Sequence, residues 1–138
     1  MKRKKPANQV WTKKIDDFCS DLVKKLVGYK CERCGKLGRQ AGGQTILNWA
    51  HIEGRGKKSV RWGFFHKKFG YIFNAFSLCV GCHWWFDNST NRGDVYEWLE
   101  EKLGKEKWRA LREQARITDS WGVKEYEAKF KELEKLST

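Results

Sequence analysis

The chain has 138 residues, of which 40% are hydrophobic and 14% aromatic, which suffices for one domain with a modest core. No apolar stretch approaches the ~20 residues that a membrane-spanning helix needs. The basic N-terminus, Met1 to Pro6, is not followed by the apolar segment of a secretory signal. We therefore expect an intracellular protein, in a bacterial or host cytoplasm, that does not act at a membrane.

The formal net charge of +12 is unevenly distributed along the chain. Residues 1–30 carry +6, residues 31–93 carry +7, and residues 94–138 carry −1. A charge that served only solubility would have no reason to leave the last third balanced. The distribution favours a partner with a phosphate backbone.

The N-terminal part is predicted to be a short tail followed by a helix. Residues 1–8 are expected to form a disordered basic tail, and residues 9–28 an amphipathic helix that stops at Gly28. Cys19 lies on or near the apolar stripe and is interpreted as a buried small hydrophobe. The stripe itself recurs at spacings of three and four residues and consists of Trp11, Ile15, Phe18, Leu22 and Leu26.

Residues 29–90 form the irregular middle of the chain, which we expect to be its functional core. A β-prone segment predicts a strand that ends at His51, followed by a loop over residues 54–58. More β-prone residues surround Arg61 and Trp62 and cover residues 69–73. A short helix is predicted from about residues 78–80 to about Asn88, with Trp84, Trp85 and Phe86 packed into the core.

Residues 91–138 are predicted to be helical, in three segments with separate apolar stripes. Gly104 ends the first segment, and Ser120 or Asp119 caps the third. We find no catalytic pattern in these helices. They are expected to cover the core or to offer a surface for a homodimer or for another protein partner.

Two C-x-x-C pairs are the most specific pattern in the chain. Cys31 and Cys34 form the first pair, and Cys79 and Cys82 form the second, which His83 follows directly. Four thiolates in two such pairs suit one tetrahedral structural zinc site. His83 could replace one cysteine, although four thiolates already fill a tetrahedral site.

The segment from Asn74 to His83 resembles the N-x-x-x-L-C-x-x-C-H signature of HNH endonucleases. Ala50-His51-Ile52 is similar to the strand-end histidine motif of that family, and the leading cysteine pair resembles the one in its zinc-stapled members. Arg55 and Arg61-Trp62 give a weaker likeness to NinG-type phage recombination proteins. The resemblance implies an α+β fold with a small ββα-metal core stapled by zinc and flanked by N- and C-terminal helices. It also implies hydrolysis of DNA phosphodiester bonds to a 5′-phosphate and a 3′-hydroxyl.

Phosphodiester hydrolysis needs an activated water and a cation near the phosphate. Neutral imidazole suits a general base near pH 7, and His51 is the candidate. His83 and Asp87 share one helix face, so together they could hold one catalytic Mg²⁺ or Mn²⁺. Asn74 would either orient His51 through backbone contacts or reach the metal. The alternative interpretations are a packed strand-end histidine at residue 51 and a solvated acid at residue 87.

The residue before His51 departs from the family pattern. Many members carry a metal-binding aspartate or histidine there, whereas Ala50 has no donor atom. The metal shell could then be completed by Asn74, water, Asn48 or Glu53. The same departure favours the alternative of a zinc-dependent nucleic-acid-binding module without catalysis.

Basic residues of the middle segment are expected to contact DNA phosphates, which positions a duplex without reading its sequence. His66 is interpreted as a surface or DNA-facing residue. The expected phosphate contacts are Arg55, Lys57, Lys58, Arg61, Lys67 and Lys68. A third interpretation of the whole chain is a phage recombination or packaging nuclease that needs a partner on its C-terminal helices.

Overall fold

A computed structural model of the chain describes residues 5–138 and has a mixed α+β architecture. The α-helices are α1 (Ala7–Leu26), α2 (Lys58–Arg61), α3 (Val80–Asn88), α4 (Arg92–Leu103), α5 (Lys105–Ala115) and α6 (Val123–Leu136), with a short 3₁₀ turn, η1 (Arg39–Ala41). The strands are β1 (Leu47–His51), β2 (Phe64–His66), β3 (Gly70–Ile72) and β4 (Ala75–Cys79). The predicted fold class, α+β with a small core between N-terminal and C-terminal helices, is confirmed, and the sheets of this core are antiparallel.

Helix α1 confirms the predicted N-terminal helix and begins two residues earlier, at Ala7. Residues 1–4 of the predicted tail lie outside the described residues. The helix ends at Leu26, and Gly28 follows with φ +72°, a left-handed conformation that glycine adopts readily. Cys19 is buried, as predicted. The buried face of α1 packs on α6 in one cluster, whose members are Ile15, Cys19, Leu22, Val23, Trp62, Tyr126 and Leu133.

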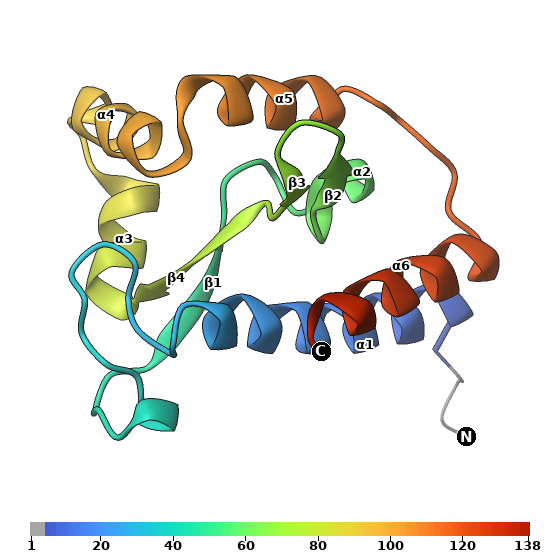
Figure 1. The fold of residues 1–138 in the computed structure, drawn as a ribbon, viewed down its shortest axis with the longest axis horizontal. Helices are drawn as coiled ribbons and strands as arrows, with labels where there is room; N and C mark the ends of the chain where they lie inside the picture. Colours follow the sequence, from blue (N-terminus) through green and yellow to red (C-terminus); the bar gives the residue numbers. More distant parts are fainter. Residues whose placement is uncertain (1–4) are drawn as a thin grey trace.

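Strands β1 and β4 pair antiparallel, from Leu47 opposite Cys79 to His51 opposite Ala75. The predicted strand therefore does end at His51. Helix α3 starts immediately after β4 and packs against both strands, so β1, β4 and α3 form one strand–strand–helix unit (Figure 1). Its core is made of Cys31, Leu47, Ala50, Phe76, Leu78, Cys79, Cys82, Phe86, Val95 and Leu99.

Helix α3 buries only part of its aromatic run. Phe86 is buried and Trp85 packs against the core, as predicted, but the Trp84 side chain is 65% exposed. The prediction that all three are core was wrong because successive helical residues point about 100° apart, so one face cannot bury all three.

The segment between β1 and β4 folds differently from its predicted pattern at one point. Arg61, placed among β-prone residues, is the last residue of α2. The second antiparallel pair, β2 and β3, confirms the β-prone assignment of residues 69–73. Helix α5 covers this part by packing on α2 through the cluster Val60, Phe64, Ile72, Leu111 and Ala115.

The C-terminal segment is helical, as predicted. Helix α4 ends at Leu103, next to Gly104. Gly122 occupies the N-cap of α6 in place of Ser120 or Asp119, and its backbone N–H is bound by the Glu125 side chain at 2.9 Å. Helices α1 and α6 lie side by side along one edge of the molecule (Figure 1). Within residues 5–138 no helix is both long and apolar enough to cross a bilayer.

Candidate metal centre and active site

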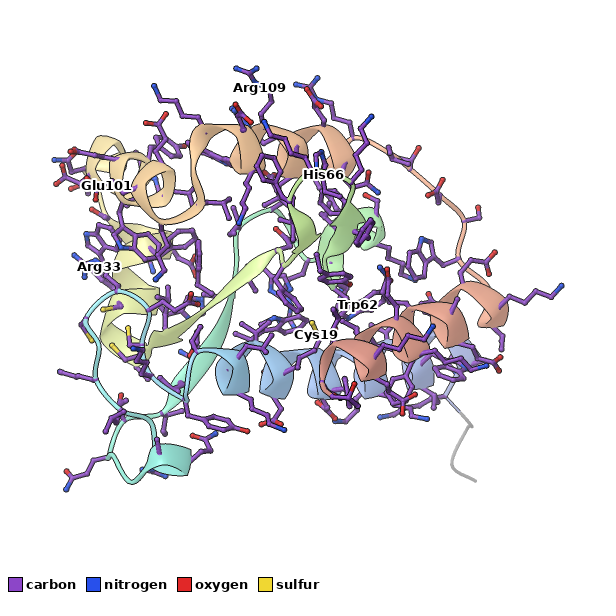
Figure 2. The ribbon with its side chains drawn as sticks, in the orientation of Figure 1. Cys19, Arg33, Trp62, His66, Glu101 and Arg109 are labelled. Carbon is purple, nitrogen blue, oxygen red and sulfur yellow. The ribbon has the colours of Figure 1, made fainter. Side chains whose placement is uncertain are left out.

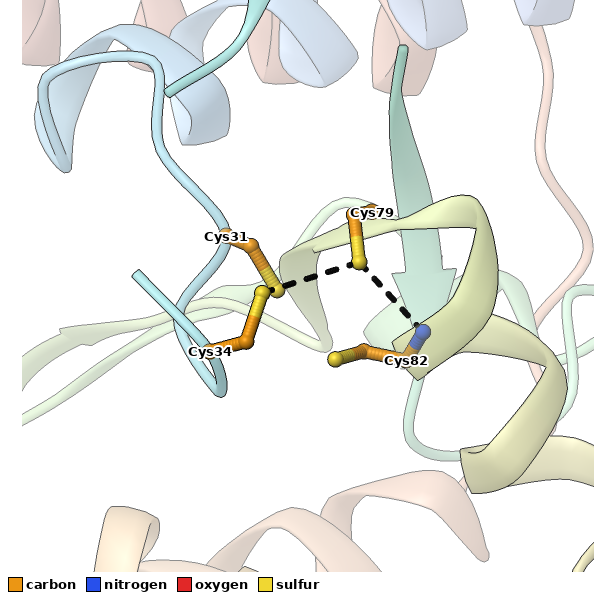
Figure 3. Close-up of side chains that lie close together, drawn as sticks. All are labelled: Cys31, Cys34, Cys79 and Cys82. Carbon is orange, nitrogen blue, oxygen red and sulfur yellow. Dashed lines mark hydrogen bonds between the residues drawn. The ribbon is translucent and has the colours of Figure 1, made fainter. Parts of the chain in front are cut away.

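The four cysteines of the two C-x-x-C pairs come together in space, and their sulfur atoms all lie within 4.8 Å of one another (Figure 3). Cys31 and Cys34 lie in the loop after α1, Cys79 ends β4, and Cys82 lies in the first turn of α3. The Cys34 and Cys79 sulfurs are 3.7 Å apart. Two ligands of a tetrahedral zinc at the usual Zn–S length are separated by about 3.8 Å. The predicted four-cysteine cluster is confirmed, and its geometry fits a structural zinc ion.

Short-range hydrogen bonds shape both cysteine turns. The backbone N–H of Cys31 donates to the Lys36 carbonyl at 2.8 Å, and that of Gly35 donates to the Cys31 carbonyl at 2.9 Å. Gly35 has φ +78°, which favours glycine at this tight turn. On the other side, the backbone N–H of Cys82 donates to the Cys79 sulfur at 3.4 Å.

Charge at the cysteine cluster is controlled by burial and by hydrogen bonds. Burial opposes ionisation of Cys31, but backbone N–H groups near its sulfur outweigh burial and lower the pKa to about 7. Burial raises the pKa of Cys82 to about 12. Four thiols this close cannot all ionise without a cation, because like charges repel. A divalent zinc ion suits this donor set for that reason.

Arg33 supplies a positive charge beside the cluster. Its Nη1 donates to the Cys82 sulfur at 3.5 Å, and its guanidinium carbon lies 3.5 Å from the centre of the Trp85 ring. Figure 2 labels Arg33 beside the sulfur atoms, at the edge of α3. The sequence analysis did not single out Arg33, although its position between Cys31 and Cys34 was a local signal.

A pocket of about 340 Å³ lies at the end of β1. It brings together three residues that the sequence assigned to catalysis or to the catalytic cation, which are His51 from β1 and His83 and Asp87 from α3. The predicted phosphate contact Arg55 lies on the same wall. The remaining lining residues are Trp49, Ile52, Glu53 and Gly54.

His51 is held against the pocket wall with its ring partly buried. The ring packs edge-on against Trp49 with 4.1 Å between ring centres, and its Nε2 is buried without a hydrogen-bond partner. Burial, followed by the positive charge of Arg55, lowers the pKa of His51 to about 4. The imidazole is therefore neutral near pH 7, which is the form that accepts a proton.

His83 and Asp87 lie one helical turn apart with their polar atoms in contact. His83 Nε2 is 3.0 Å from Asp87 Oδ2, and His83 Nδ1 is 3.1 Å from Asn48 Nδ2. Two neighbouring ligands of an octahedral cation at about 2.1 Å are also about 3.0 Å apart. Asn48 therefore contacts His83, a candidate ligand, at the ring nitrogen that does not face Asp87.

Among residues 5–138, the four cysteines are the one group of three or more histidine, cysteine or acidic side chains whose ligand atoms lie this close together. The pair His83 and Asp87 has no third protein donor of these types at that range within the described part of the chain. Mg²⁺ commonly takes one or two protein ligands and completes its shell with water and substrate phosphate oxygens, so two donors fit such an ion.

The side-chain amide of Asn74 is hydrogen-bonded to the backbone that follows β1. Its Oδ1 accepts from the Glu53 N–H at 2.8 Å, and its Nδ2 donates to the Glu53 carbonyl at 3.0 Å. Asn74 is 1% exposed. Of the two roles considered from sequence, this geometry favours orientation through the backbone over contact with a metal.

Ala50 lies in the core, completely buried beside residues of β4 and α3. A longer side chain with a donor atom would have to displace that packing. The position before His51 therefore contributes to the core and offers no metal ligand.

The predicted phosphate contacts fall into two groups. Arg55, Lys57, Lys67 and Lys68 are exposed. Three of them also lie near a carboxylate, Arg55 at 3.8 Å from Asp16, Lys57 at 3.6 Å from Glu53 and Lys68 at 2.6 Å from Glu106. Lys58 is half-buried, and its ammonium donates to the Tyr126 hydroxyl.

Arg61 is committed to the fold. Its Nη2 and Nε donate to the Asp16 carboxylate at 2.6 and 2.9 Å, and its Nη1 donates to the Arg55 carbonyl at 2.7 Å. The Arg61 side chain is 15% exposed. We therefore withdraw Arg61 from the residues expected to contact phosphates.

Asp16 on α1 is a residue that sequence reasoning missed. It also accepts from the Trp62 indole N–H at 2.8 Å. Burial alone would raise the pKa of Asp16, but the hydrogen bonds from Arg61 and Trp62 outweigh burial and lower it. No sequence pattern pointed to this pairing, because its partners lie in distant segments.

His66 lies at the end of β2 and outside the pocket, on the opposite side of the β2–β3 pair from Trp62 and Cys19 (Figure 2). Its Nδ1 accepts from the Lys68 backbone N–H at 3.1 Å, and its ring stacks on Phe69. It closes the turn between β2 and β3, and it does not belong to the candidate active site.

The comparisons with known proteins found no counterpart for the chain. No family model matches it, and neither the curated proteins nor the solved structures contain a match. Its class is therefore defined by its own features, which are an α+β fold, a four-cysteine cluster whose geometry fits zinc, and a histidine-containing pocket.

Proposed function

We propose that the chain is a metal-dependent endonuclease of the HNH type that hydrolyses DNA phosphodiester bonds. One observation supports this most directly. His51 from β1 and the pair His83 and Asp87 from α3 line one pocket together with the cationic side chain of Arg55. The sequence resemblance assigned these same histidines to the general base and to the catalytic cation.

The chemistry follows from the protonation state and position of each group. His51 is neutral near pH 7 and takes a proton from a water molecule that attacks the phosphorus. Its low pKa weakens it as a base, and a bound phosphate in the pocket would raise that pKa by adding negative charge. Arg55 contacts the phosphate and offsets its charge.

His83 and Asp87 would hold one Mg²⁺ or Mn²⁺ ion, with Asn48 bracing the His83 ring from its other nitrogen. Such an ion supplies Lewis-acid stabilisation of the phosphate and of the leaving 3′-oxygen. Zinc at the four cysteines would hold the loop after α1 against β4 and α3, and α3 carries His83 and Asp87 of the pocket.

Asn74 acts as a positioning residue in this proposal. Its two hydrogen bonds fix the backbone of Glu53, two residues after His51, and thereby the exit of β1. The exposed basic side chains of Lys57 and Lys67 would contact the DNA backbone.

A second candidate function is a zinc-dependent nucleic-acid-binding module without catalysis. Ala50, which is buried and has no donor atom, favours this alternative, as does the absence of a third donor near His83 and Asp87 among residues 5–138. If the isolated chain binds DNA without cutting it, the proposal takes another form. The chain would then be a nuclease of phage recombination or packaging that cuts only with a partner bound to α4–α6.

A plasmid-nicking experiment tests the proposal. Protein that retains zinc is incubated with supercoiled DNA and Mg²⁺ or Mn²⁺, with His51→Ala and His66→Ala beside the wild type. We expect wild type and His66→Ala to nick, and His51→Ala to bind DNA without nicking. Intact binding without nicking by any protein would favour the binding module or the partner-dependent nuclease, and equal nicking by His51→Ala would reject His51 as the base.

A further inference from the structure

A second hollow, of about 550 Å³, adjoins the candidate active site. Trp49 and Arg55 line both hollows, so the two share a wall. The other lining residues are Asn8, Gln9, Thr12, Lys13, Asp16, Asp17 and Ser20 of α1, together with Lys58. We call this hollow the α1 groove. Its α1 residues lie outside the segment that resembles HNH endonucleases, whereas Trp49, Arg55 and Lys58 lie inside that segment.

The lining of the α1 groove is mixed in charge and rich in hydrogen-bonding groups. Amides and hydroxyls come from the first half of α1, and Lys13 pairs with Asp17 at 2.7 Å on the rim. Asp17 is paired with Lys13, and Asp16 is bound by Arg61 and Trp62, so the groups left for a ligand are the amides and hydroxyls. Amide side chains pair with the edges of adenine. The lining therefore suits a nucleobase better than a bare backbone.

Trp49 adds an aromatic surface at the boundary between the two hollows. Its ring is partly buried, its Nε1 lies buried without a hydrogen-bond partner, and the Arg55 guanidinium carbon lies 5.9 Å from its centre. Aromatic side chains stack on unpaired bases regardless of base identity. An arginine at the same boundary can contact the phosphate that joins one nucleotide to the next.

We propose that the α1 groove is a nucleotide-binding subsite that receives the base next to the scissile phosphate. The base must be accessible, so the preferred substrate is a single-stranded or branched DNA segment and not a continuous duplex. The inference rests on the proposed function for the position of the scissile phosphate, because His51 and Arg55 mark that position. The subsite itself can be tested by binding alone.

The experiment introduces a large side chain that fills the α1 groove. Thr12→Trp places a large side chain in the lining, and Val10→Trp makes a similar change on the same helix at a residue that is 53% exposed and outside the groove. Zinc-loaded proteins are titrated into a labelled single-stranded oligonucleotide and into a matched duplex without Mg²⁺, and binding is followed by fluorescence anisotropy. Thermal melts of both variants identify any loss of folding.

We expect Thr12→Trp to weaken single-strand binding by about tenfold, the cost of one lost base stack, with little change for Val10→Trp. Wild type should also bind the single strand more tightly than the duplex. Equal affinities of the two variants for the single strand would overturn the subsite, as would wild type that binds no oligonucleotide. If Thr12→Trp does not fold, Gln9→Ala replaces it, with a loss of single-strand affinity as the expected result and unchanged affinity as the overturning one.

Hydrolysis of bis(p-nitrophenyl) phosphate by wild type separates this inference from the proposed function. The small diester carries no nucleobase, so it reports on the pocket at His51. No hydrolysis together with a difference in binding between the variants would reject a nuclease that acts without a partner and would support the subsite. Hydrolysis together with equal binding would support the nuclease and reject the subsite.

Discussion

Asn74 and Glu53 are joined by two hydrogen bonds in which the Asn74 amide pairs with both backbone groups of Glu53. A third bond, from the Ile52 N–H to the Asn74 carbonyl at 2.9 Å, extends the pairing of β1 and β4 beyond His51. The segment after His51 is therefore held by strand-like hydrogen bonds, although β1 itself ends at His51. This relationship explains how an asparagine outside the pocket can set the geometry inside it.

Asn74→Ala should lower the free energy of unfolding by about 2–3 kcal/mol, because two backbone groups lose a buried partner. Urea unfolding measures the change. Asn88→Ala is the matched control, since Asn88 is exposed and bonds only to the Trp84 carbonyl of its own helix. A similar small loss in both variants would mean that the Asn74 bonds do not stabilise the loop.

Removal of one cysteine should abolish zinc binding. Cys79→Ala is expected to bind no zinc after purification and to melt at a much lower temperature, because structural zinc contributes directly to folding energy. Metal analysis and thermal unfolding measure these changes. Cys19→Ala is the control. Cys19 contacts the Trp62 carbonyl in a separate core cluster, so that variant should retain one zinc ion per chain.

Arg33→Ala should speed the loss of zinc to a chelator by several-fold. The guanidinium next to the Cys82 sulfur offsets the negative charge of the thiolates and shields that sulfur through its stack on Trp85. Release is followed with a coloured zinc indicator. Arg39→Ala removes an exposed arginine from η1 and should leave the rate unchanged. Equal rates for the two variants would contradict the role of Arg33.

His51 should make the stability of the protein depend on pH below about 6.5. The pKa of His51 is about 4 in the folded chain, so between these values the unfolded chain binds a proton that the folded chain does not. The free energy of unfolding then falls as pH drops from 6.5 to 4, by at most about 3 kcal/mol before solvent screening reduces it.

Urea unfolding across this pH range, compared with His51→Gln, isolates the contribution of His51. The wild type should lose more stability than the variant as pH falls. With three histidines in the chain, NMR titration also resolves the pKa directly. A value of about 6.5 or above, the ordinary range for histidine, would contradict the burial of the ring.

Asp16 and Arg61 should be energetically coupled. A double-mutant cycle with Asp16→Asn and Arg61→Gln is expected to give a coupling of about 1–3 kcal/mol, because both side chains are largely buried and bonded at two points. The exposed pair Lys13 and Asp17 is the control and should give at most about 0.5 kcal/mol. Equal couplings would indicate that the Asp16 pair is as screened as a surface pair.

Local patterns were sufficient to predict much of this molecule. The spacing of apolar residues predicted α1 and the C-terminal helices to within a few residues, because a helix with one buried face repeats about every 3.6 residues. The two C-x-x-C pairs predicted the cluster of four sulfurs, since a turn between two cysteines aims both at one point. β-prone residues before His51 predicted β1 and its end.

Side-chain partners across the fold were not predictable in the same way. Trp84 and Phe86 lie two residues apart, yet one is exposed and the other buried, which depends on where the sheet meets α3. Arg61 is a basic residue of the kind that contacts phosphates, and only its ion pair with Asp16 on α1 shows that it stabilises the fold instead. No local sequence pattern encodes this ion pair, because it forms only when α1 packs against the segment that carries Arg61.

The sequence by itself determined the two C-x-x-C turns, the helical segments and the strand-end position of His51, because each depends on residues near one another in the chain. The tertiary structure alone decided that His51, His83, Asp87 and Arg55 share one pocket and that α1 lines a second hollow beside it. Those relations join residues far apart in sequence. They follow from the packing of β1, α3 and α1, which depends on the shapes of all the side chains between them.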